Sequence, residues 1–458
     1  MAAVSPARRE AFRILLAVGR GSAHADDLLR GSAVNALAPA DRHLATALVL
    51  GVLRWQLWLD ELIRPLLKRP GARLDAEVLT ALRLGAFQLL FLDRIPAHAA
   101  IGESVELAKQ AGHRFASAMV NAVLRKLAQR ENVSENAAAA AAVDAYPAWM
   151  VERWAAHFGA DAARAICTHG QTQPAGVARI ADSKVEEELA LSGVQLVPGA
   201  LLTCAREVSA GDVTATAAFH EGRVRMQDEG SQLIAELAAC CGDDLNQKTK
   251  GALDVKSVLD ACAAPGGKTL ILAERIPQAR IVACESSAKR LAQMRERLGV
   301  YAERIECRHA DASEIEEANA FDLALVDAPC SGTGTLGRNP EIRHRLKPED
   351  LARHAERQKA ILRAALRAVR PGGWVVYATC SLEPEENEEV VAAVLSEVDD
   401  AHQVSLASRI DRLHEGKIFT EAGAETLHAC LTQEGALRLL PGALRTDGFF
   451  VSLIKKNS

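Results

Sequence analysis

The 458-residue chain lacks several features that would assign it to a class at once. It has no unbroken run of eighteen apolar residues, so no membrane-spanning helix and no membrane partner are expected. None of its ten cysteines forms a C-x-x-C pair, so we expect no metal site, and we expect reduced thiols that mostly fill the core. The apolar run near the N-terminus is too short for a signal peptide, which favours a helix of a folded, cytoplasmic protein.

The net charge of −5 is unevenly distributed along the chain. Residues 1–130 hold 18 Lys and Arg against 11 Asp and Glu, a net charge of +7, while the remaining residues sum to −12. A basic third on an acidic protein favours an anionic partner for that third. Charge alone supports a merely solvated helical surface equally well.

Three regions differ in their hydrophobic pattern. Residues 1–130 carry apolar residues at helical spacing, which predicts a compact all-α domain. After a linker, "RENVSENAAAAAAVDAYP", residues 146–225 combine an amphipathic helix with short strand-like stretches and predict a small α+β module. Residues 226–458 alternate strands with helices, which predicts an α/β domain on a doubly wound parallel sheet. We expect the last stretch, "GFFVSLIKK", to be an antiparallel strand at the edge of this sheet.

A glycine turn, "CAAPGGKT" at residues 262–269, follows the first predicted strand of the third region. A P-loop requires a glycine where Cys262 stands, and a dinucleotide fingerprint requires three spaced glycines where only Gly266 and Gly267 are present. Both phosphate-binding assignments therefore fail. A bare turn before a helix still admits a ligand to the main chain, and it suits a cofactor with an adenosine and an amino-acid carboxylate.

The other predicted strands also end in polar or reactive residues, and the carboxyl ends of parallel strands meet at one edge. Glu285 is suited to accept hydrogen bonds from ribose hydroxyls, but it could also be a neighbour of a helix N-cap. Asp311 is suited to accept a hydrogen bond from an adenine amino group, but it could equally be an ordinary helix N-cap. Asp327 would be costly to bury without a partner. Cys330 and Cys380 follow the fourth and fifth strands, so we expect two thiols to face one cleft.

Three motifs, "LDACAAPGGKT", "DAPCSGTG" and "ATCSLEPEENEEVV", together resemble those of the RNA cytosine-5 methyltransferases of the Sun/RsmB/NOL family. The resemblance covers about residues 226–456. The basic helical region resembles, in pattern and placement, the NusB-like domain of the bacterial RsmB branch. The resemblance implies a Rossmann-like methyltransferase sheet, S-adenosylmethionine as cofactor, and an unpaired or loop cytosine of 16S ribosomal RNA as substrate. We expect a monomer.

The resemblance also implies a role for each motif residue. Cys380 would attack carbon-6 of cytosine, Cys330 would serve the later elimination, and Asp327 would contact the ring nitrogen and exocyclic amine. The residues implied to bind the cofactor are Cys262, Ala263, Ala264, Pro265, Gly266, Gly267, Lys268, Glu285, Arg290, Asp311 and Asp327. The family's usual aspartate is glutamate at position 285, which can make the same ribose bonds. DNA cytosine-5 methyltransferases use the Pro-Cys thiol instead, so spacing alone does not choose between the two cysteines.

Two alternatives stay open at this point. One is the same chemistry on transfer RNA, and the other is an RNA-binding assembly factor with a vestigial site, although both cysteines are intact. Whether the substrate is ribosomal RNA or transfer RNA, the target base must leave its stack to reach a thiol of the enzyme. A basic segment after Cys330 is expected to grip phosphates beside that base; its cations are Arg338, Arg343, Arg345 and Lys347.

Overall fold

The computed structural model describes residues 4–21, 23–130, 133–241 and 255–458. Residues 131–132 of the predicted linker and residues 242–254 of the predicted third domain lie outside these ranges. The chain forms two compact units. The helical unit comprises Met1–Gln173 and Thr335–Leu346, and the sheet unit comprises Pro174–Gly334 and Lys347–Ser458.

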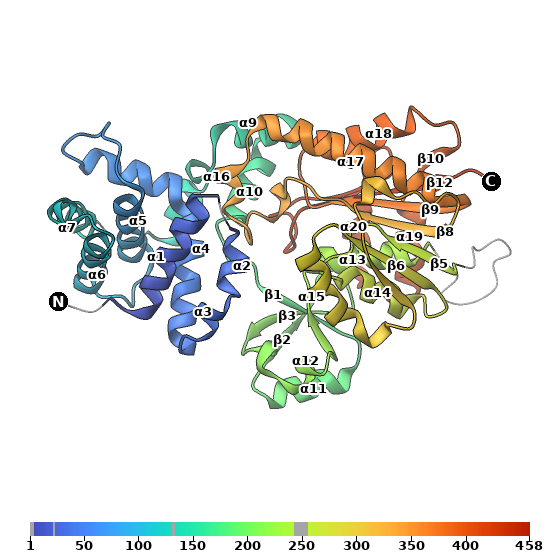
Figure 1. Ribbon diagram of the computed structural model, residues 1–458, viewed down its shortest axis with the longest axis horizontal. Coiled ribbons are helices and arrows are strands. Elements are labelled where there is room, and N and C mark those ends of the chain that lie inside the picture. Colours follow the sequence, from blue (N-terminus) through green and yellow to red (C-terminus); the bar gives the residue numbers. More distant parts are fainter. Residues whose placement is uncertain (1–3, 22, 131–132, 242–254) are drawn as a thin grey trace. The chain divides into compact units, whose positions relative to one another are not determined.

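The helical unit is all-α, as the spacing of its apolar residues predicts (Figure 1). Pro6 and Pro39 begin two of its helices, where a missing N–H group is not needed. Gly51 permits a close helix contact, because a Cβ there would lie 2.0 Å from Cζ of Phe87. The helices are α1 (Pro6–Gly19), α2 (Ala25–Leu29), α3 (Ser32–Asn35), α4 (Pro39–Ile63), α5 (Ala76–Phe91), α6 (Ala97–Gln110), α7 (Ser117–Leu127), α8 (Glu135–Ala141), α9 (Ala148–Phe158), α10 (Ala160–His169) and α16 (Ile342–Arg345).

The compact units divide the chain differently from the three predicted domains. Residues 146–173, expected in the small module, belong to the helical unit. The single amphipathic helix expected there is two helices, α9 and α10, because Gly159 adopts a φ of +89° between them. Trp154 of α9 is buried and meets the ring of Tyr146 edge-on at 5.7 Å.

Residues Thr335–Leu346 also belong to the helical unit, although they follow the Pro-Cys motif in sequence. Arg343 of this segment is 1% exposed, and its guanidinium lies 3.8 Å from the ring centroid of Tyr146. Its nitrogens donate to the carbonyls of Arg54, Ala145, Gly170 and Leu336 and to the Tyr146 hydroxyl, at 3.1–3.4 Å. Every one of these partners is neutral, so the segment carries a buried cation held by dipoles.

The prediction that this basic segment grips RNA phosphates is therefore wrong for two of its cations. Arg343 is enclosed, and Arg345 donates to the carbonyl oxygens of Val18 and Ala23. Sequence composition could not distinguish these arginines from solvated ones, because their acceptors lie hundreds of residues away in the chain. Lys347, just beyond the segment, is exposed.

The sheet unit begins with a small antiparallel sheet in the order β2-β3-β1-β4, flanked by two helices. Buried ion pairs attach it to the rest of the unit, since Arg179 lies 2.8 Å from Glu236 and 3.3 Å from Glu274. The elements are β1 (Gly176–Ile180), α11 (Ser183–Leu191), β2 (Gln195–Pro198), β3 (Ala205–Ala210), α12 (Ala217–His220) and β4 (Val224–Met226).

The main sheet has the strand order β10-β12-β9-β8-β5-β6-β7, with β11 paired to β12. Strands β7, β6, β5, β8 and β9 are parallel, as the alternating pattern predicts. The chain reverses its direction of winding between β5 and β8, which is where such sheets bind ligands. The strands are β5 (Ser257–Asp260), β6 (Arg280–Glu285), β7 (Ile305–His309), β8 (Phe321–Asp327), β9 (Val369–Thr379), β10 (Ala401–Val404), β11 (Leu437–Leu439) and β12 (Phe449–Lys456).

The final strand, β12, is antiparallel as predicted, but the prediction that it forms the edge is wrong. It lies between β9 and β10, so β10 is the edge strand. The four residues of β10, "AHQV", are too few and too polar to give a strand pattern in the sequence.

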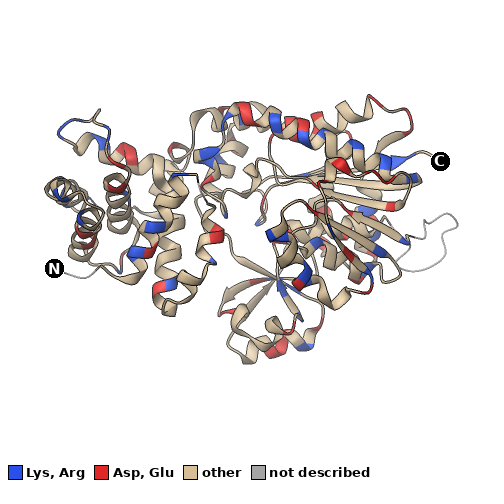
Figure 2. Ribbon diagram, viewed as in Figure 1, with Lys and Arg blue, Asp and Glu red and all other residues tan. Residues whose placement is uncertain are grey.

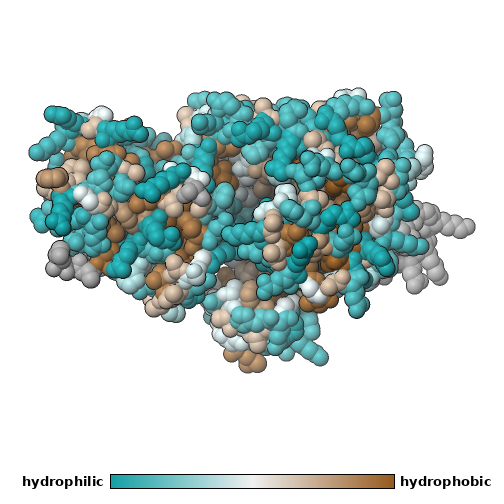
Figure 3. Space-filling model, viewed as in Figure 1, coloured by the Kyte–Doolittle hydropathy of each residue, from teal (hydrophilic) through white to brown (hydrophobic). Residues whose placement is uncertain are grey.

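Helices cover both faces of the main sheet (Figure 1). Alternate residues of β5 show this division, because Val258 packs in one apolar cluster and Leu259 in the other. The first face carries α13 (Glu229–Ala239), α14 (Gly267–Arg275), α15 (Ala288–Leu298), α19 (Ala407–Glu415) and α20 (Glu421–Ala429), and the second carries α17 (Pro348–Ala368) and α18 (Glu388–Leu395). The outer side of α17 is hydrophilic (Figure 3). No helix in the described ranges is long and apolar enough to cross a membrane.

Candidate active site

The glycine turn after β5 is tight enough to require glycine. Gly266 has a φ of +96° at the N-cap of α14, a left-handed conformation that other residues avoid. A Cβ on Gly267 would lie only 3.2 Å from Cδ of Gln227. The main chain is therefore bare at the point where a ligand would meet the N-terminus of α14.

Two arginines of α15 hold this turn from outside. Arg290 donates to the carbonyl oxygen of Ala264 at 2.8 Å, and Arg297 donates to that of Pro265 at 3.3 Å. Arg290 also lies 3.5 Å from the carboxylate of Glu285. The family resemblance implies that Arg290 binds the cofactor, and in the structure Arg290 contacts two other residues of that set, Ala264 and Glu285.

Glu285 and Asp311 lie at the ends of β6 and β7, as predicted, and each has local partners. Glu285 is 6% exposed and its Oε1 accepts a hydrogen bond from the amide of Ser287 at 2.7 Å. Asp311 accepts from the amide and hydroxyl of Ser313, and these bonds lower the pKa of Asp311. Asp311 also lies 3.5 Å from Arg357. The local hydrogen bonds of the helix-capping alternative are thus present at both positions, and the ligand role stays a prediction.

Asp327, at the end of β8, has the partner that its burial demands. Its Oδ2 lies 2.7 Å from Nζ of Lys268, which comes from the start of α14. Burial lowers the pKa of Lys268, but the Asp327 carboxylate more than compensates and leaves the pKa raised. The lysine therefore stays charged and joins the glycine turn to the end of β8.

Beneath this pair lies a second carboxylate, Asp260, which is fully buried at the end of β5. Its Oδ2 accepts a hydrogen bond from the Thr269 hydroxyl at 2.7 Å. Burial raises the pKa of Asp260 to about 7, and the charge of Asp327 adds to that rise. Asp260 was not predicted as a site residue, because a carboxylate at a strand end carries no signal of its burial in the sequence.

The two predicted thiols are in contact. Because β8 and β9 are neighbours, Sγ of Cys330 and Sγ of Cys380 lie 3.1 Å apart. The hydrogen bond to Cys380, together with burial, raises the pKa of Cys330 well above its ordinary value. The thiolate form of Cys330 is therefore disfavoured. The amide of Gly334 donates to the Cys380 carbonyl at 2.9 Å and fastens the two turns together.

Sequence reasoning missed a buried carboxylate behind the thiols. Glu386 is 0% exposed and accepts hydrogen bonds from Ser331, Ser381 and Gln358. It lies in "SLEPEEN", where three glutamates stand within four residues; Glu383 and Glu386 are both fully buried, and the sequence pattern distinguishes neither from the third.

The predicted site residues fall into two groups. The first group joins the glycine turn to the end of β8 through Lys268 and Asp327, and joins the ends of the neighbouring strands β8 and β9 through Cys330 and Cys380. The second group, Glu285 and Asp311, lies at the ends of β6 and β7. Cys262 packs among apolar side chains on the α17 face, and burial raises the pKa of its thiol. Within the described ranges, no three His, Cys, Asp or Glu side chains are arranged to hold a metal ion.

Two family models match the chain. Residues 252–455 match the 16S rRNA methyltransferase RsmB/F family, and residues 5–129 match the NusB family. The NusB match coincides with the first part of the helical unit.

Relatives match the whole length of the chain. The probable ribosomal RNA small subunit methyltransferase B of Bacillus subtilis is 33% identical over 97% of this chain and 98% of its own length. The ribosomal RNA small subunit methyltransferase B of Pseudomonas putida is 35% identical over 98% of both chains.

Solved structures share the fold. The crystal structure of PH0851 superposes with a TM-score of 0.78 and 22% identity, over 99% of this chain and 100% of that one. NSun6 from Pyrococcus horikoshii gives a TM-score of 0.54 and 17% identity, over 69% of this chain and 100% of that one. At these identities the likeness concerns the fold alone, whereas the sequence matches decide the family. The chain belongs to the RsmB/F family of 16S rRNA methyltransferases.

Proposed function

We propose that this protein transfers a methyl group from S-adenosylmethionine to carbon-5 of a cytosine in 16S ribosomal RNA. The observation that carries the proposal is the contact between the Cys330 and Cys380 sulfurs, next along the sheet edge to the Lys268–Asp327 pair. A thiol and an acid are what activation of a cytosine ring requires. The names of the Bacillus and Pseudomonas relatives support ribosomal RNA as the substrate.

The residues of the glycine turn fit a nucleoside cofactor. Gly266 and Gly267 leave the main chain bare, and the N-terminus of α14 suits a carboxylate. Glu285 would hold the ribose and Asp311 the adenine, while Arg290 would keep the turn in shape. S-adenosylmethionine, when bound, supplies an electrophilic methyl group.

Cys380 is the proposed nucleophile. Carbon-5 of cytosine is a poor nucleophile, but addition of a thiolate to carbon-6 makes the ring enamine-like and activates carbon-5. Asp327, which matches the family's acid, would contact the exocyclic amine and help ring nitrogen-3 take up the proton that the Cys380 thiol gives up as its sulfur adds to carbon-6. One consideration supports this assignment: the hydrogen bond to Cys380 and burial raise the pKa of Cys330, which disfavours Cys330 as the attacking thiolate.

Cys330 is the proposed agent of release. After methylation, carbon-5 must lose its proton while the bond between carbon-6 and the Cys380 sulfur breaks. A second sulfur 3.1 Å from the first is placed to assist that elimination. The products are methylated RNA, S-adenosylhomocysteine and the free Cys380 thiol, whose proton balances the one that carbon-5 loses.

Bisulfite mapping of 16S ribosomal RNA from a deletion strain tests the reaction. We expect one cytosine to lose its protection from conversion and to regain it on complementation. The transfer RNA fraction of the same cells tests the alternative substrate. Protection lost only in transfer RNA would contradict the ribosomal assignment but not the chemistry.

Two cysteine variants test the roles of the thiols. Cys330→Ala should accumulate a protein–RNA adduct that survives denaturing electrophoresis, because attack proceeds while release fails. Cys380→Ala and the double variant should form no adduct, and all three should bind S-adenosylmethionine. An adduct formed by Cys380→Ala and lost in Cys330→Ala would show that the roles are exchanged.

A further inference from the structure

Glu386 is a buried carboxylate with no cationic partner in the described part of the chain. A buried charge is costly unless its oxygens are hydrogen-bonded. Here each oxygen accepts two bonds: Oε1 accepts from the Ser331 amide at 2.8 Å and from Nε2 of Gln358 at 2.9 Å, and Oε2 accepts from the hydroxyls of Ser331 and Ser381. All four donors are neutral, so they hold the Glu386 carboxylate in place by hydrogen bonds and do not neutralise its charge.

The donors flank both thiols. Ser331 directly follows Cys330, and Ser381 directly follows Cys380; their hydroxyl oxygens lie 3.0 Å apart. Gln358 of α17 also donates to the carbonyl oxygen of Pro329 at 3.0 Å, on the other side of Cys330. One carboxylate therefore connects the turn that contains Pro329 and Cys330, here the Pro-Cys turn, to the turn that contains Thr379 and Cys380, here the Thr-Cys turn.

The backbone around Glu386 is itself fixed to β9. The Tyr377 hydroxyl donates to the Glu386 carbonyl at 2.6 Å. The side chain of Asn387 accepts from the Thr379 hydroxyl at 2.5 Å and donates to the Ser381 carbonyl at 2.9 Å. The carboxylate is thus anchored on a central strand and has little freedom to follow either turn if the turn moves.

We propose that Glu386 is a positioning residue that binds the Pro-Cys turn to the Thr-Cys turn and so keeps the sulfurs of Cys330 and Cys380 in contact. Its consequence for methyl transfer rests on the proposed function. We call these four hydrogen bonds of Glu386 the clamp, and its effect on the distance between the two sulfurs can be measured without any substrate.

Two substitutions distinguish the effect of the hydrogen bonds of Glu386 from the effect of its negative charge. In Glu386→Gln the amide oxygen still accepts from Ser331 and Gln358, and the amide nitrogen donates to the two serine hydroxyls, which rotate to accept. In Glu386→Ala all four bonds are lost. The glutamine variant therefore keeps the clamp without the charge, and the alanine variant keeps neither.

Phenylarsine oxide reports whether the sulfurs stay together. Its arsenic bonds to both sulfurs of a close thiol pair, and the two thiol protons leave with the oxygen as water. Peptide mass spectrometry should find the 330–380 bridge forming at the same rate in wild type and Glu386→Gln, and at least ten-fold more slowly in Glu386→Ala. Cys330→Ala, which cannot form this bridge, separates the signal from the adjacent buried pair Cys240 and Cys241.

Methyl transfer should follow the same order. We expect kcat to fall about 100-fold in Glu386→Ala and less than three-fold in Glu386→Gln, because small misplacements of reacting groups cost about that much. KM for S-adenosylmethionine should stay within two-fold in both variants. Recovery by glutamine and a change confined to kcat are not what a general loss of folding produces.

The proposal is overturned if folded Glu386→Ala is bridged at the wild-type rate, or if Glu386→Gln is as impaired as Glu386→Ala. If Glu386→Ala does not fold, Ser381→Ala replaces it under the same criteria, since it removes only the hydroxyl link to the second turn. A wild-type enzyme that methylates no carbon-5 would end the proposed function, while the bridging rates would still decide the clamp.

Discussion

Two basic segments of the helical unit use their cations in opposite ways. In Thr335–Leu346, Arg343 and Arg345 donate to backbone carbonyls, and Arg343 is enclosed. The loop between α4 and α5 is also rich in cations (Figure 2), and all four are exposed: Arg64, Lys68, Arg69 and Arg73. None of these four side chains makes an ion pair with the described residues.

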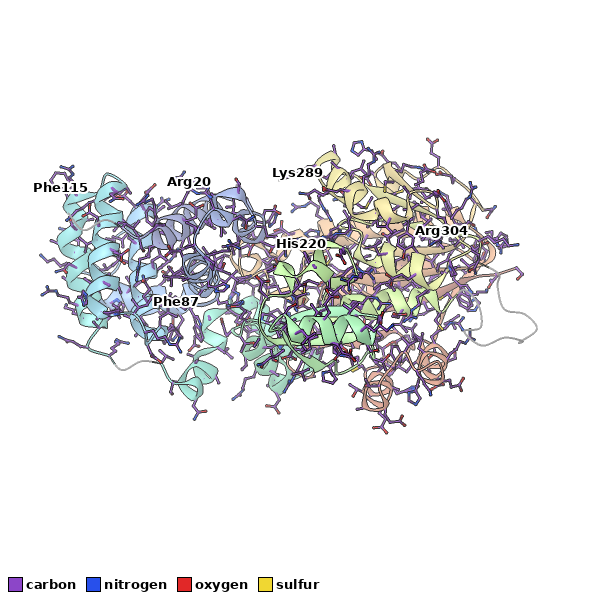
Figure 4. All side chains as sticks on the ribbon, turned by 90° about the horizontal axis from the view of Figure 1, so that it is seen from below. Arg20, Phe87, Phe115, His220, Lys289 and Arg304 are labelled. Carbon is purple, nitrogen blue, oxygen red and sulfur yellow. The ribbon has the colours of Figure 1, made fainter. Side chains whose placement is uncertain are left out.

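This difference shows why proximity to the active-site cysteine in sequence misleads. The buried segment follows Cys330 directly, yet its arginines stabilise the helical unit. The loop is hundreds of residues away in sequence, yet its cations are available to an anionic ligand. An exposed aromatic lies at the same end of the unit: Phe115 is fully exposed (Figure 4), and the neighbouring His113 lies 3.2 Å from Asp75, which follows the loop. Exposed cations near an exposed ring are typical of surfaces that bind single-stranded RNA.

The largest effect is expected from Arg343→Ala. It removes the hydrogen bonds to three distant carbonyls and opens a cavity beside Tyr146, so the free energy of unfolding should fall by about 3 to 5 kcal/mol. Urea unfolding followed by circular dichroism measures this loss. Lys347→Ala, at an exposed position, is the control and should change stability by less than about 0.5 kcal/mol. Equal stability of the two variants would show that the buried arginine is not structural.

A pH-dependent effect is expected from His344, in the same buried segment. Burial, opposed by the bond to the Leu53 carbonyl and aided by the neighbouring Arg343, lowers the pKa of His344 to about 4. The folded state therefore prefers neutral imidazole. The stability from this preference is complete above pH 6.5, declines as the pH falls, and is lost once the pH passes below about 4.

His344→Gln should remove this dependence. Between pH 7 and pH 4 the wild type should lose about 3 kcal/mol more stability than the variant. Thermal unfolding across that range measures the difference, and His98→Gln, at an exposed position, should behave as wild type. Parallel pH profiles for wild type and His344→Gln would contradict the burial argument.

The fold could be predicted wherever a helix or strand shows its own periodicity of apolar residues in the local sequence. The long helices of residues 1–130 and the parallel strands show their periodicity locally, and the adjacency of β8 and β9 follows from winding rules. Membership of Thr335–Leu346 in the helical unit was not predictable, because it depends on acceptors such as the Gly170 carbonyl that no pattern reveals. The edge strand β10 was not predictable either, because its four residues are too few to show a strand pattern in the sequence.

The candidate site divides in the same way. Cys330, Cys380 and Asp327 could be found from sequence because reactive groups at strand ends are rare and meet at one edge. The contact between the sulfurs of Cys330 and Cys380 follows from the adjacency of β8 and β9 in the sheet. Glu386 could not be found, because its role depends on hydroxyl and amide donors from three separate segments.

The smallest effect in energy is expected from the exposed loop, and it should concern RNA rather than stability. Neutralising Arg64, Lys68, Arg69 and Arg73 to glutamine should weaken RNA binding about 10- to 100-fold near 0.1 M salt. The slope of log affinity against log salt should fall by about 3, since each lost phosphate contact removes 0.7 to 0.9. Unfolding free energy should stay within about 0.5 kcal/mol of wild type, because the side chains are exposed.

A matched variant distinguishes this loop from general charge. Neutralising four exposed cations of the sheet unit, Lys184, Arg280, Arg367 and Lys417, changes net charge equally and should reduce the salt slope much less. Fluorescence anisotropy with a 16S fragment at several salt concentrations measures both variants. Deleting residues 1–130 would be a poorer experiment, because it removes the Arg54 carbonyl and strips Arg343 of a partner. Equal slopes for the two neutralised variants would mean that the loop is a solvated surface, and the contrast between the two basic segments would then concern stability alone.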